Sequence, residues 1–119
     1  MIANIPDYNG PGVYALVDDF GKKYIGSSMR VADRIREHNK YFKLYRNHGH
    51  TSYLSSKIEF SISAGLSFSA EVVEVCPAGI TREDLRQREG IALLRAGGLA
   101  NTYNVVPIRV RQGAGGDRL

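Results

Sequence analysis

The sequence predicts a domain of mixed strands and helices, because strand-like and helix-like patterns succeed one another along its 119 residues. A hairpin pattern covers residues 12–27, and helical spacing of apolar residues follows up to Phe42. A segment rich in β-formers, 68–76, precedes a second helix-like stretch that ends near Ala96. A chain of this length can bury one modest core, so we expect a single folded unit.

The hairpin is expected to bring two tyrosines onto one face of the sheet. Its turn ends at a glycine, and a three-residue loop there would pair Asp18 with Lys22. That register places Tyr14 opposite Gly26 and makes Tyr14 and Tyr24 diagonal neighbours on the same face. A loop one residue longer or shorter would separate the two tyrosines.

Helical spacing begins after the hairpin, where Ser27 and Ser28 offer hydroxyls that can cap a helix N-terminus. The following apolar residues are spaced by four and seven positions and form one stripe: Val31, Ile35 and Phe42. Arg34 and His38 lie four residues apart and border this stripe, so they are neighbours on one helix face. The two tyrosines, the arginine and the histidine can therefore converge, although packing or a solvated charge explains each of them taken alone.

The remaining elements are a short helix, a strand and a last helix. A polar loop at 46–51 leads to a short helix at Tyr53–Phe60, and the strand follows at Phe68–Cys76. Thr81, with an acidic residue three positions later, resembles a capping box. The helix that it opens is expected to reach about Ala96, where two glycines end it.

Both ends of the chain are expected to add little to the core. Met1–Pro11 is a lead-in that we place across the sheet edge, and Val105–Val110 is a candidate edge strand weakened by a proline. We expect a domain at 1–108 and a Gly- and Arg-containing tail at 109–119.

The composition limits the compartment and the classes of partner. The net charge of +4 is compatible with a polyanionic partner. Cys76 is the single cysteine, so no disulfide can form within the chain, and we expect a reducing, cytoplasmic compartment. The first ten residues do not resemble a signal peptide, and no stretch is long and apolar enough to span a membrane.

Glu89 is predicted to lie in the apolar stripe of the last helix. Leu85 and Leu93 lie four residues before and after it, on the same helix face. A desolvated carboxylate is costly unless it is paired or binds a metal ion. The helical pattern leaves two explanations open: a structural ion pair, with Arg34 or Arg88, or a metal ligand.

Taken in order, these residues resemble the core motifs of the GIY-YIG nuclease family. The two half-motifs are written here as Gly-Val-Tyr at 12–14 and Tyr-Ile-Gly at 24–26, with ten residues from one tyrosine to the next. The match continues further along the chain: Arg34, His38, Glu89 and the pair Tyr103-Asn104. It looks closer to the homing and restriction branches than to the excision-repair branch, whose members usually have lysine where this chain has Ser27.

The resemblance implies an α/β fold of the α+β type, with a small, mainly antiparallel three-stranded sheet flanked by helices. It implies a metal-dependent endonuclease that hydrolyses phosphodiester bonds in DNA, in particular duplex DNA. Glu89 would hold the cofactor, Mg²⁺ with Mn²⁺ as a substitute, because hard oxygen ligands suit Mg²⁺. The alternative function is a nucleic-acid-binding module of the same fold that does not cleave.

The resemblance also suggests a role for each site residue. Tyr14 would be the general base, which requires its pKa to fall by about three units from about 10, or roughly 4 kcal/mol. Arg34 would offer a planar fork to two phosphate oxygens, and His38 would accept a proton. Tyr24 would position the water or the phosphate, and Asn104 would orient the carboxylate or the phosphate. The roles of the two tyrosines are interchangeable at this point.

Further residues of the first helix and of the loop after it complete the predicted site. Phosphate contacts are expected from Ser27 and from basic residues of the helix, although a solvated helix surface explains the latter equally well: Arg30, Arg36, Lys40 and Lys43. His50 lies where some homing members hold a further site histidine. A zinc site built from His38, His48 and His50 is an alternative to Mg²⁺. A further alternative is that His48 and His50 are simply solvated residues of the loop.

Overall fold

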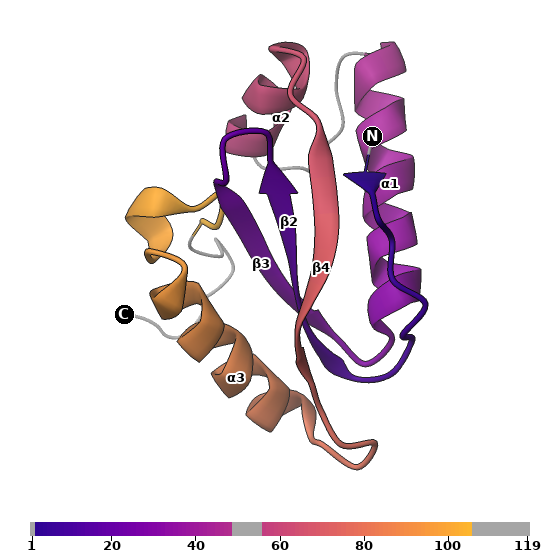
Figure 1. Ribbon diagram of the computed structural model, residues 1–119, viewed down its shortest axis with the longest axis vertical. Coiled ribbons are helices and arrows are strands. Elements are labelled where there is room, and N and C mark those ends of the chain that lie inside the picture. Colours follow the sequence, from indigo (N-terminus) through magenta and orange to yellow (C-terminus); the bar gives the residue numbers. More distant parts are fainter. Residues whose placement is uncertain (1, 49–55, 106–119) are drawn as a thin grey trace, which may run out of the picture.

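The computed structural model describes residues 2–48 and 56–105, which form a four-stranded sheet with helices on both faces (Figure 1). The strands lie in the order β1-β4-β2-β3, with these bounds: β1 (Ile2–Ala3), β2 (Gly12–Asp18), β3 (Lys23–Ser28) and β4 (Phe68–Val75). The pairs β2–β3 and β2–β4 are antiparallel, and β1–β4 is parallel. The predicted α+β class with a mainly antiparallel sheet is confirmed, and the lead-in adds the short strand β1 to the three predicted strands.

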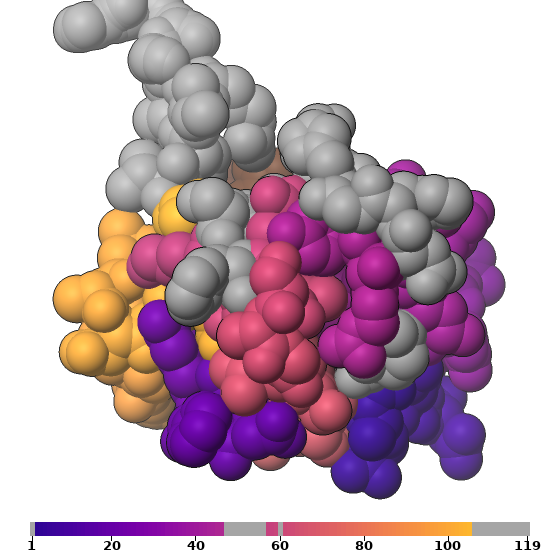
Figure 2. Space-filling model, turned by 90° about the horizontal axis from the view of Figure 1, so that it is seen from above, coloured from indigo at the N-terminus to yellow at the C-terminus, as the bar shows by residue number. Residues whose placement is uncertain are grey.

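The helices of the described residues cover the two faces of the sheet unequally. They are α1 (Val31–His48), α2 (Ser56–Ser63), α3 (Arg82–Arg95) and the 3₁₀-helix η1 (Leu99–Asn101). α1 and α2 pack on one face and α3 packs on the other. Seen from above, α2 and the residues that lead into β4 lie between α1 and the segment after α3 (Figure 2). None of these helices is long and apolar enough to cross a membrane.

Each face of the sheet has its own core. On the α1 side the buried side chains are mostly large: Tyr14, Leu16, Ile35, Phe42 and Phe68. On the α3 side they are smaller on average: Val13, Ala15, Ile25, Leu85 and Ala92. Burial of apolar surface is the main favourable term in folding, so these two cores fix the helices on the sheet. Because successive strand residues point to opposite faces, neighbours along β2 and β3 enter different cores.

The hairpin has the predicted register. Tyr14 pairs with Gly26, and the Asp18 N–H donates to the Lys22 carbonyl at 2.9 Å. Gly21 in the turn has a φ of 90°, in the left-handed region that favours glycine. Gly26 is required by packing, because a Cβ at this position would lie 2.5 Å from Cζ and from the hydroxyl oxygen of Tyr14. The glycine of the Tyr-Ile-Gly motif thus leaves space for the Tyr14 ring.

The predicted serine cap of α1 is wrong. Both serines belong to β3, and α1 begins only at Val31. The first N–H groups of α1 are bound by the lead-in instead: the Val31 N–H donates to the Gly10 carbonyl at 3.1 Å, and the Asp33 N–H donates to Asn9 Oδ1 at 2.9 Å. A cap that comes from a distant segment leaves no signal beside the helix, so the local pattern could not reveal it.

The other helix boundaries differ from the predictions by a few residues. α1 extends to His48, into the predicted polar loop, and α2 begins at Ser56. α3 begins as predicted after Thr81, whose Oγ1 accepts the Asp84 N–H at 3.1 Å. The candidate edge strand beyond Val105 and the tail lie outside the described residues.

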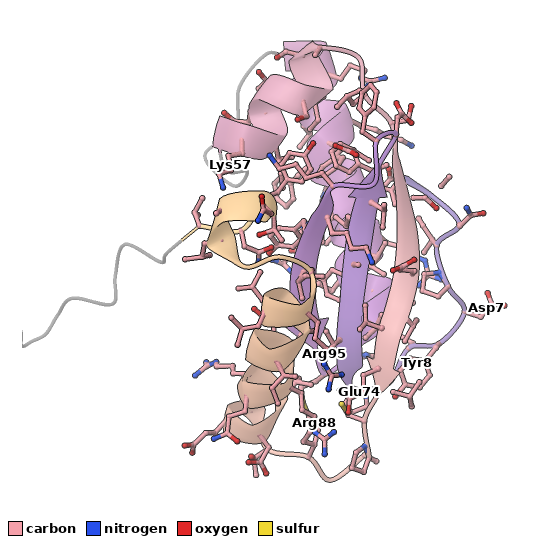
Figure 3. All side chains as sticks on the ribbon, turned by 60° about the vertical axis from the view of Figure 1, so that its left-hand side comes forward. Asp7, Tyr8, Lys57, Glu74, Arg88 and Arg95 are labelled. Carbon is pink, nitrogen blue, oxygen red and sulfur yellow. The ribbon has the colours of Figure 1, made fainter. Side chains whose placement is uncertain are left out.

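The free edge of β3 is covered by the residues that follow η1. The Tyr103 N–H donates to the Lys23 carbonyl at 2.9 Å. The Asn104 amide binds both main-chain groups of Ile25, accepting from its N–H at 2.9 Å and donating to its carbonyl at 2.8 Å. Lys57 of α2 (Figure 3) holds both η1 and this segment by donating to three carbonyls: Leu99, Thr102 and Asn104.

Candidate active site

The predicted site residues converge around β3, an edge strand of the sheet. Tyr24 lies on the α1 side, where it meets His38, the hydrogen-bond partner of Tyr14. Ser27 lies on the α3 side and contacts Glu89. At an edge, side chains from both faces can reach the same space, whereas in mid-sheet the strands would separate them. The edge position of β3 therefore lets α1 and α3 contribute to one site.

Tyr14 and His38 form a buried hydrogen-bonded pair. The Tyr14 hydroxyl oxygen lies 2.7 Å from His38 Nε2, and the two residues are 1% and 3% exposed. Burial, and then the nearby charge of Arg34, lowers the pKa of His38 to about 3. The imidazole is therefore neutral at physiological pH, with one nitrogen that donates and one that accepts.

Tyr24 is half-buried and packs edge-on against His38, with 5.5 Å between the ring centroids. Burial raises the pKa of Tyr24, the charge of Glu89 raises it further, and the charge of Arg34 opposes both. The phenol therefore stays protonated at neutral pH and can donate a hydrogen bond to a water or a phosphate. The influence of both charges indicates that Arg34 of α1 and Glu89 of α3 lie near the same phenol.

Arg34 presents its guanidinium at the surface of the site. Its side chain is 32% exposed and pairs with Glu37, three residues further along α1. A guanidinium has five N–H donors in a planar fork, so one carboxylate does not exhaust its capacity. Arg34 can therefore bind a phosphate while it remains anchored to α1.

Glu89 lies where the helical spacing predicts, near the buried Leu85 and Ala92 on α3, and is itself half-buried. The Ser27 hydroxyl donates to Glu89 Oε1 at 2.5 Å. A hydroxyl donor orients a carboxylate without neutralising its charge. The two arginines considered as ion-pair partners contact other carboxylates: Arg34 pairs with Glu37, and Arg88 pairs with Glu74 (Figure 3).

The carboxylate of Glu89 is a hard oxygen ligand of the kind that Mg²⁺ binds. Mg²⁺ commonly takes one or two carboxylates and fills the rest of its coordination shell with water and phosphate oxygens. The residues at this place therefore fit Mg²⁺.

Within residues 2–48 and 56–105 there is no group of three His, Cys, Asp or Glu side chains that could hold a metal ion. Of the histidines in the zinc alternative, His38 binds Tyr14 and His50 lies outside the described residues.

Asn104 meets the site through the main chain of β3. Its side-chain amide hydrogen-bonds both the N–H and the carbonyl of Ile25, the residue between Tyr24 and Gly26, and Asn104 itself is buried. An amide offers a donor and an acceptor in the same way as a peptide group, so Asn104 replaces a neighbouring strand at this point. This contact fixes the strand segment that carries Tyr24.

A groove of about 800 Å³ adjoins the site, between the end of β3, α1 and the first turn of α3. Ser27 lines it, which connects the groove to Glu89. Its basic lining residues come from both helices and from the residue before α1: Arg30, Arg34, Arg36, Lys40 and Arg82. Lys43, which the sequence grouped with them, is exposed on α1 but does not line this groove.

Arg82 is the basic residue of the groove lining that the sequence analysis did not identify. It is the first residue of α3 and precedes Glu89 by seven positions, which is close to two helical turns. Residues at this spacing lie on the same helix face. The spacing from Glu89 was therefore the signal that could have identified Arg82.

A search of solved structures matches this fold to the catalytic domain of the homing endonuclease I-TevI. The match has a TM-score of 0.66, covers 82% of this chain and 99% of that chain, and has 22% sequence identity. No protein-family model and no curated protein matches the chain. The agreement over nearly the whole length of that catalytic domain confirms the fold expected from the order of the motifs. The chain adopts the GIY-YIG nuclease fold.

Proposed function

We propose that this chain is a metal-dependent endonuclease that hydrolyses phosphodiester bonds in DNA. The proposal rests on one observation, the convergence of four groups at the edge of β3: the Tyr14–His38 pair, Arg34 and Glu89. Phosphodiester hydrolysis needs a base for the attacking water and positive charge at the phosphate. The similarity in fold to the catalytic domain of a homing endonuclease supports the same reaction class.

In this proposal Tyr14 takes the proton of the attacking water, and His38 supports it as a hydrogen-bond donor. The pKa of the His38 imidazole, about 3, lies far below the ordinary pKa of a phenol, so transfer of the Tyr14 proton to His38 is strongly unfavourable. His38 is therefore better suited to donate a hydrogen bond to an ionised Tyr14 than to accept the proton of Tyr14. Acceptance of that proton is the role that the sequence suggested. The positive charge of Arg34, close to this pair, also favours the ionised phenol.

The other residues bind and orient the substrate. Arg34 binds two oxygens of the scissile phosphate through its planar fork. Tyr24 stays protonated and donates a hydrogen bond to the water or the phosphate. Asn104 acts indirectly, by holding β3 in place. Mg²⁺ or Mn²⁺, held by Glu89, would neutralise charge on the phosphate and stabilise the leaving oxygen.

The groove beside the site supplies further contacts with the phosphate backbone. Arg36 and Lys40 of α1 line it together with Arg34 and with Arg30, which directly precedes the helix. Contacts of this kind bind any sequence and set the register of the substrate. We propose duplex DNA as the substrate, with one strand entering the groove.

Incubation of supercoiled plasmid with the protein, in Mg²⁺ and in EDTA, tests the proposal. We expect nicked or linear plasmid in Mg²⁺ and intact plasmid in EDTA. Glu89→Gln should abolish cleavage, whereas Glu83→Gln, at an exposed position of the same helix, should retain the wild-type rate. A plasmid that is bound but stays intact in both Mg²⁺ and Mn²⁺ would favour the alternative, a binding module that does not cleave.

A further inference from the structure

The groove beside Glu89 has basic residues on two opposing sides. One side belongs to α1 and the residue before it, with Arg30, Arg34, Arg36 and Lys40, and the other belongs to α3, with Arg82. The sequence placed DNA-phosphate contacts at Ser27 and on the first helix, and none on the last helix. A residue on the α3 side would define how the substrate strand runs, because the strand would then lie between the two helices.

Most of the α1 side is already paired with carboxylates of the same helix. Asp33 pairs with both Arg30 and Arg36, and Glu37 pairs with Arg34. Among the residues that the structure describes, no carboxylate lies within 4.0 Å of the charged groups of Lys40 or Arg82. The charge of Arg82 is therefore available to an anion in the groove, without the loss of an existing ion pair.

Arg82 also has a fixed relation to the proposed metal ligand. It lies on the same face of α3 as Glu89, seven residues earlier, which corresponds to about 10.5 Å along the helix axis. A nucleic-acid strand carries a charge at every nucleotide, so a strand with one phosphate beside Glu89 has further phosphates within this range.

We propose that Arg82 binds a backbone phosphate flanking the scissile one, so that the substrate strand is held between α1 and α3. This inference rests on the proposed function, since it assumes that the reacting phosphate lies beside Glu89 and Arg34. Arg82 acts in binding and register, and it takes no part in proton transfer.

The test compares Arg82→Gln with Arg95→Gln, which removes an exposed arginine on the opposite face of α3 that does not line the groove. Affinity for a short labelled duplex is measured in Ca²⁺, which blocks turnover, over a series of KCl concentrations. We expect Arg82→Gln to lower the affinity by about threefold to tenfold at low salt and to reduce the slope of log K against log salt by about one. Arg95→Gln should leave both values unchanged.

Single-turnover cleavage in Mg²⁺, measured on the same proteins, separates this inference from the proposed function. If wild-type protein cleaves and Arg82→Gln keeps the wild-type affinity and salt slope, the Arg82 contact is wrong and the endonuclease proposal stands. If wild-type protein binds without cleaving while the salt slope falls only in Arg82→Gln, the contact is supported and the endonuclease proposal is wrong. Equal losses in Arg82→Gln and Arg95→Gln would show general attraction, which also overturns the specific contact.

Discussion

Substitution of Tyr14 by phenylalanine should affect stability and rate separately. The ring remains, so its packing against Gly26 is preserved, but the hydroxyl bound to His38 is lost. His38 is only 3% exposed, so water cannot easily replace the lost partner. An unpaired buried polar group typically costs about 1 to 3 kcal/mol, and we expect the free energy of unfolding to fall by about that amount in urea denaturation.

A double-mutant cycle identifies the source of this loss. Tyr14→Phe combined with His38→Leu removes both partners, and no buried polar atom of the pair is left unsatisfied. The double mutant should therefore lose less stability than the sum of the two single mutants. Strict additivity would show that the 2.7 Å contact contributes little to stability.

The rate effect should be larger than the stability effect. General-base assistance is typically worth about 10² to 10⁴ in rate, so Tyr14→Phe should lose that factor in single-turnover cleavage at saturating Mg²⁺. DNA binding in Ca²⁺ should change little. Tyr24→Phe is the matched control, because it removes one positioning hydrogen bond, worth about 0.5 to 1.5 kcal/mol. If Tyr24→Phe is the more damaged, the roles of the tyrosines are exchanged, and if neither is impaired, the mechanism is wrong.

The pH dependence of stability provides a further check on the pair. The pKa of His38 is about 3 in the folded protein, below its ordinary value of 6.5. Between these values the unfolded chain binds a proton that the folded chain does not bind, so stability present above pH 6.5 is lost as the pH falls towards 3. The slope should approach 1.4 kcal/mol per pH unit for this one proton, and it should diminish in His38→Leu. A slope that His38→Leu leaves unchanged would contradict the lowered pKa.

Three further substitutions test the rest of the site. Arg34→Lys should lose most activity despite keeping the charge, because lysine lacks the planar fork, and a single-turnover rate near wild type would reduce Arg34 to general attraction. Ser27→Ala should weaken Mn²⁺ binding in calorimetry, since Glu89 loses the hydroxyl that orients it, and Ser27→Thr should restore binding. Gly26→Ala should lower the free energy of unfolding by about 1 to 3 kcal/mol in urea denaturation, because the added Cβ would collide with the Tyr14 ring.

Local patterns predicted the features that depend on nearby residues. The turn chemistry at Gly21 fixed the hairpin register, and that register alone placed Tyr14 and Tyr24 on one face. Thr81 capped α3 as expected, because a capping box involves residues three positions apart. The position of Glu89 on α3 followed from helical periodicity in the same way.

The contacts that complete the site join residues far apart in the chain, and no local pattern encodes them. Ser27 and Glu89 are 62 positions apart, and Ile25 and Asn104 are 79 positions apart. Sequence reasoning therefore assigned Ser27 to a helix cap and to phosphate binding, although its hydroxyl binds a carboxylate. Motif order placed these residues in one site, but it could not give their partners, which depend on how α3 packs against the sheet.

The use of an edge strand explains how so small a domain can build a site from two faces of its sheet. An edge strand exposes unpaired N–H and C=O groups, which invite pairing with other chains unless something covers them. Tyr103 and Asn104 cover the edge at Lys23 and Ile25, whereas the groove opens near Ser27, just beyond the covered part. The cover therefore ends where the substrate would enter. Asn104→Ala should loosen this edge near Tyr24, because the strand would lose both hydrogen bonds between Ile25 and the Asn104 amide.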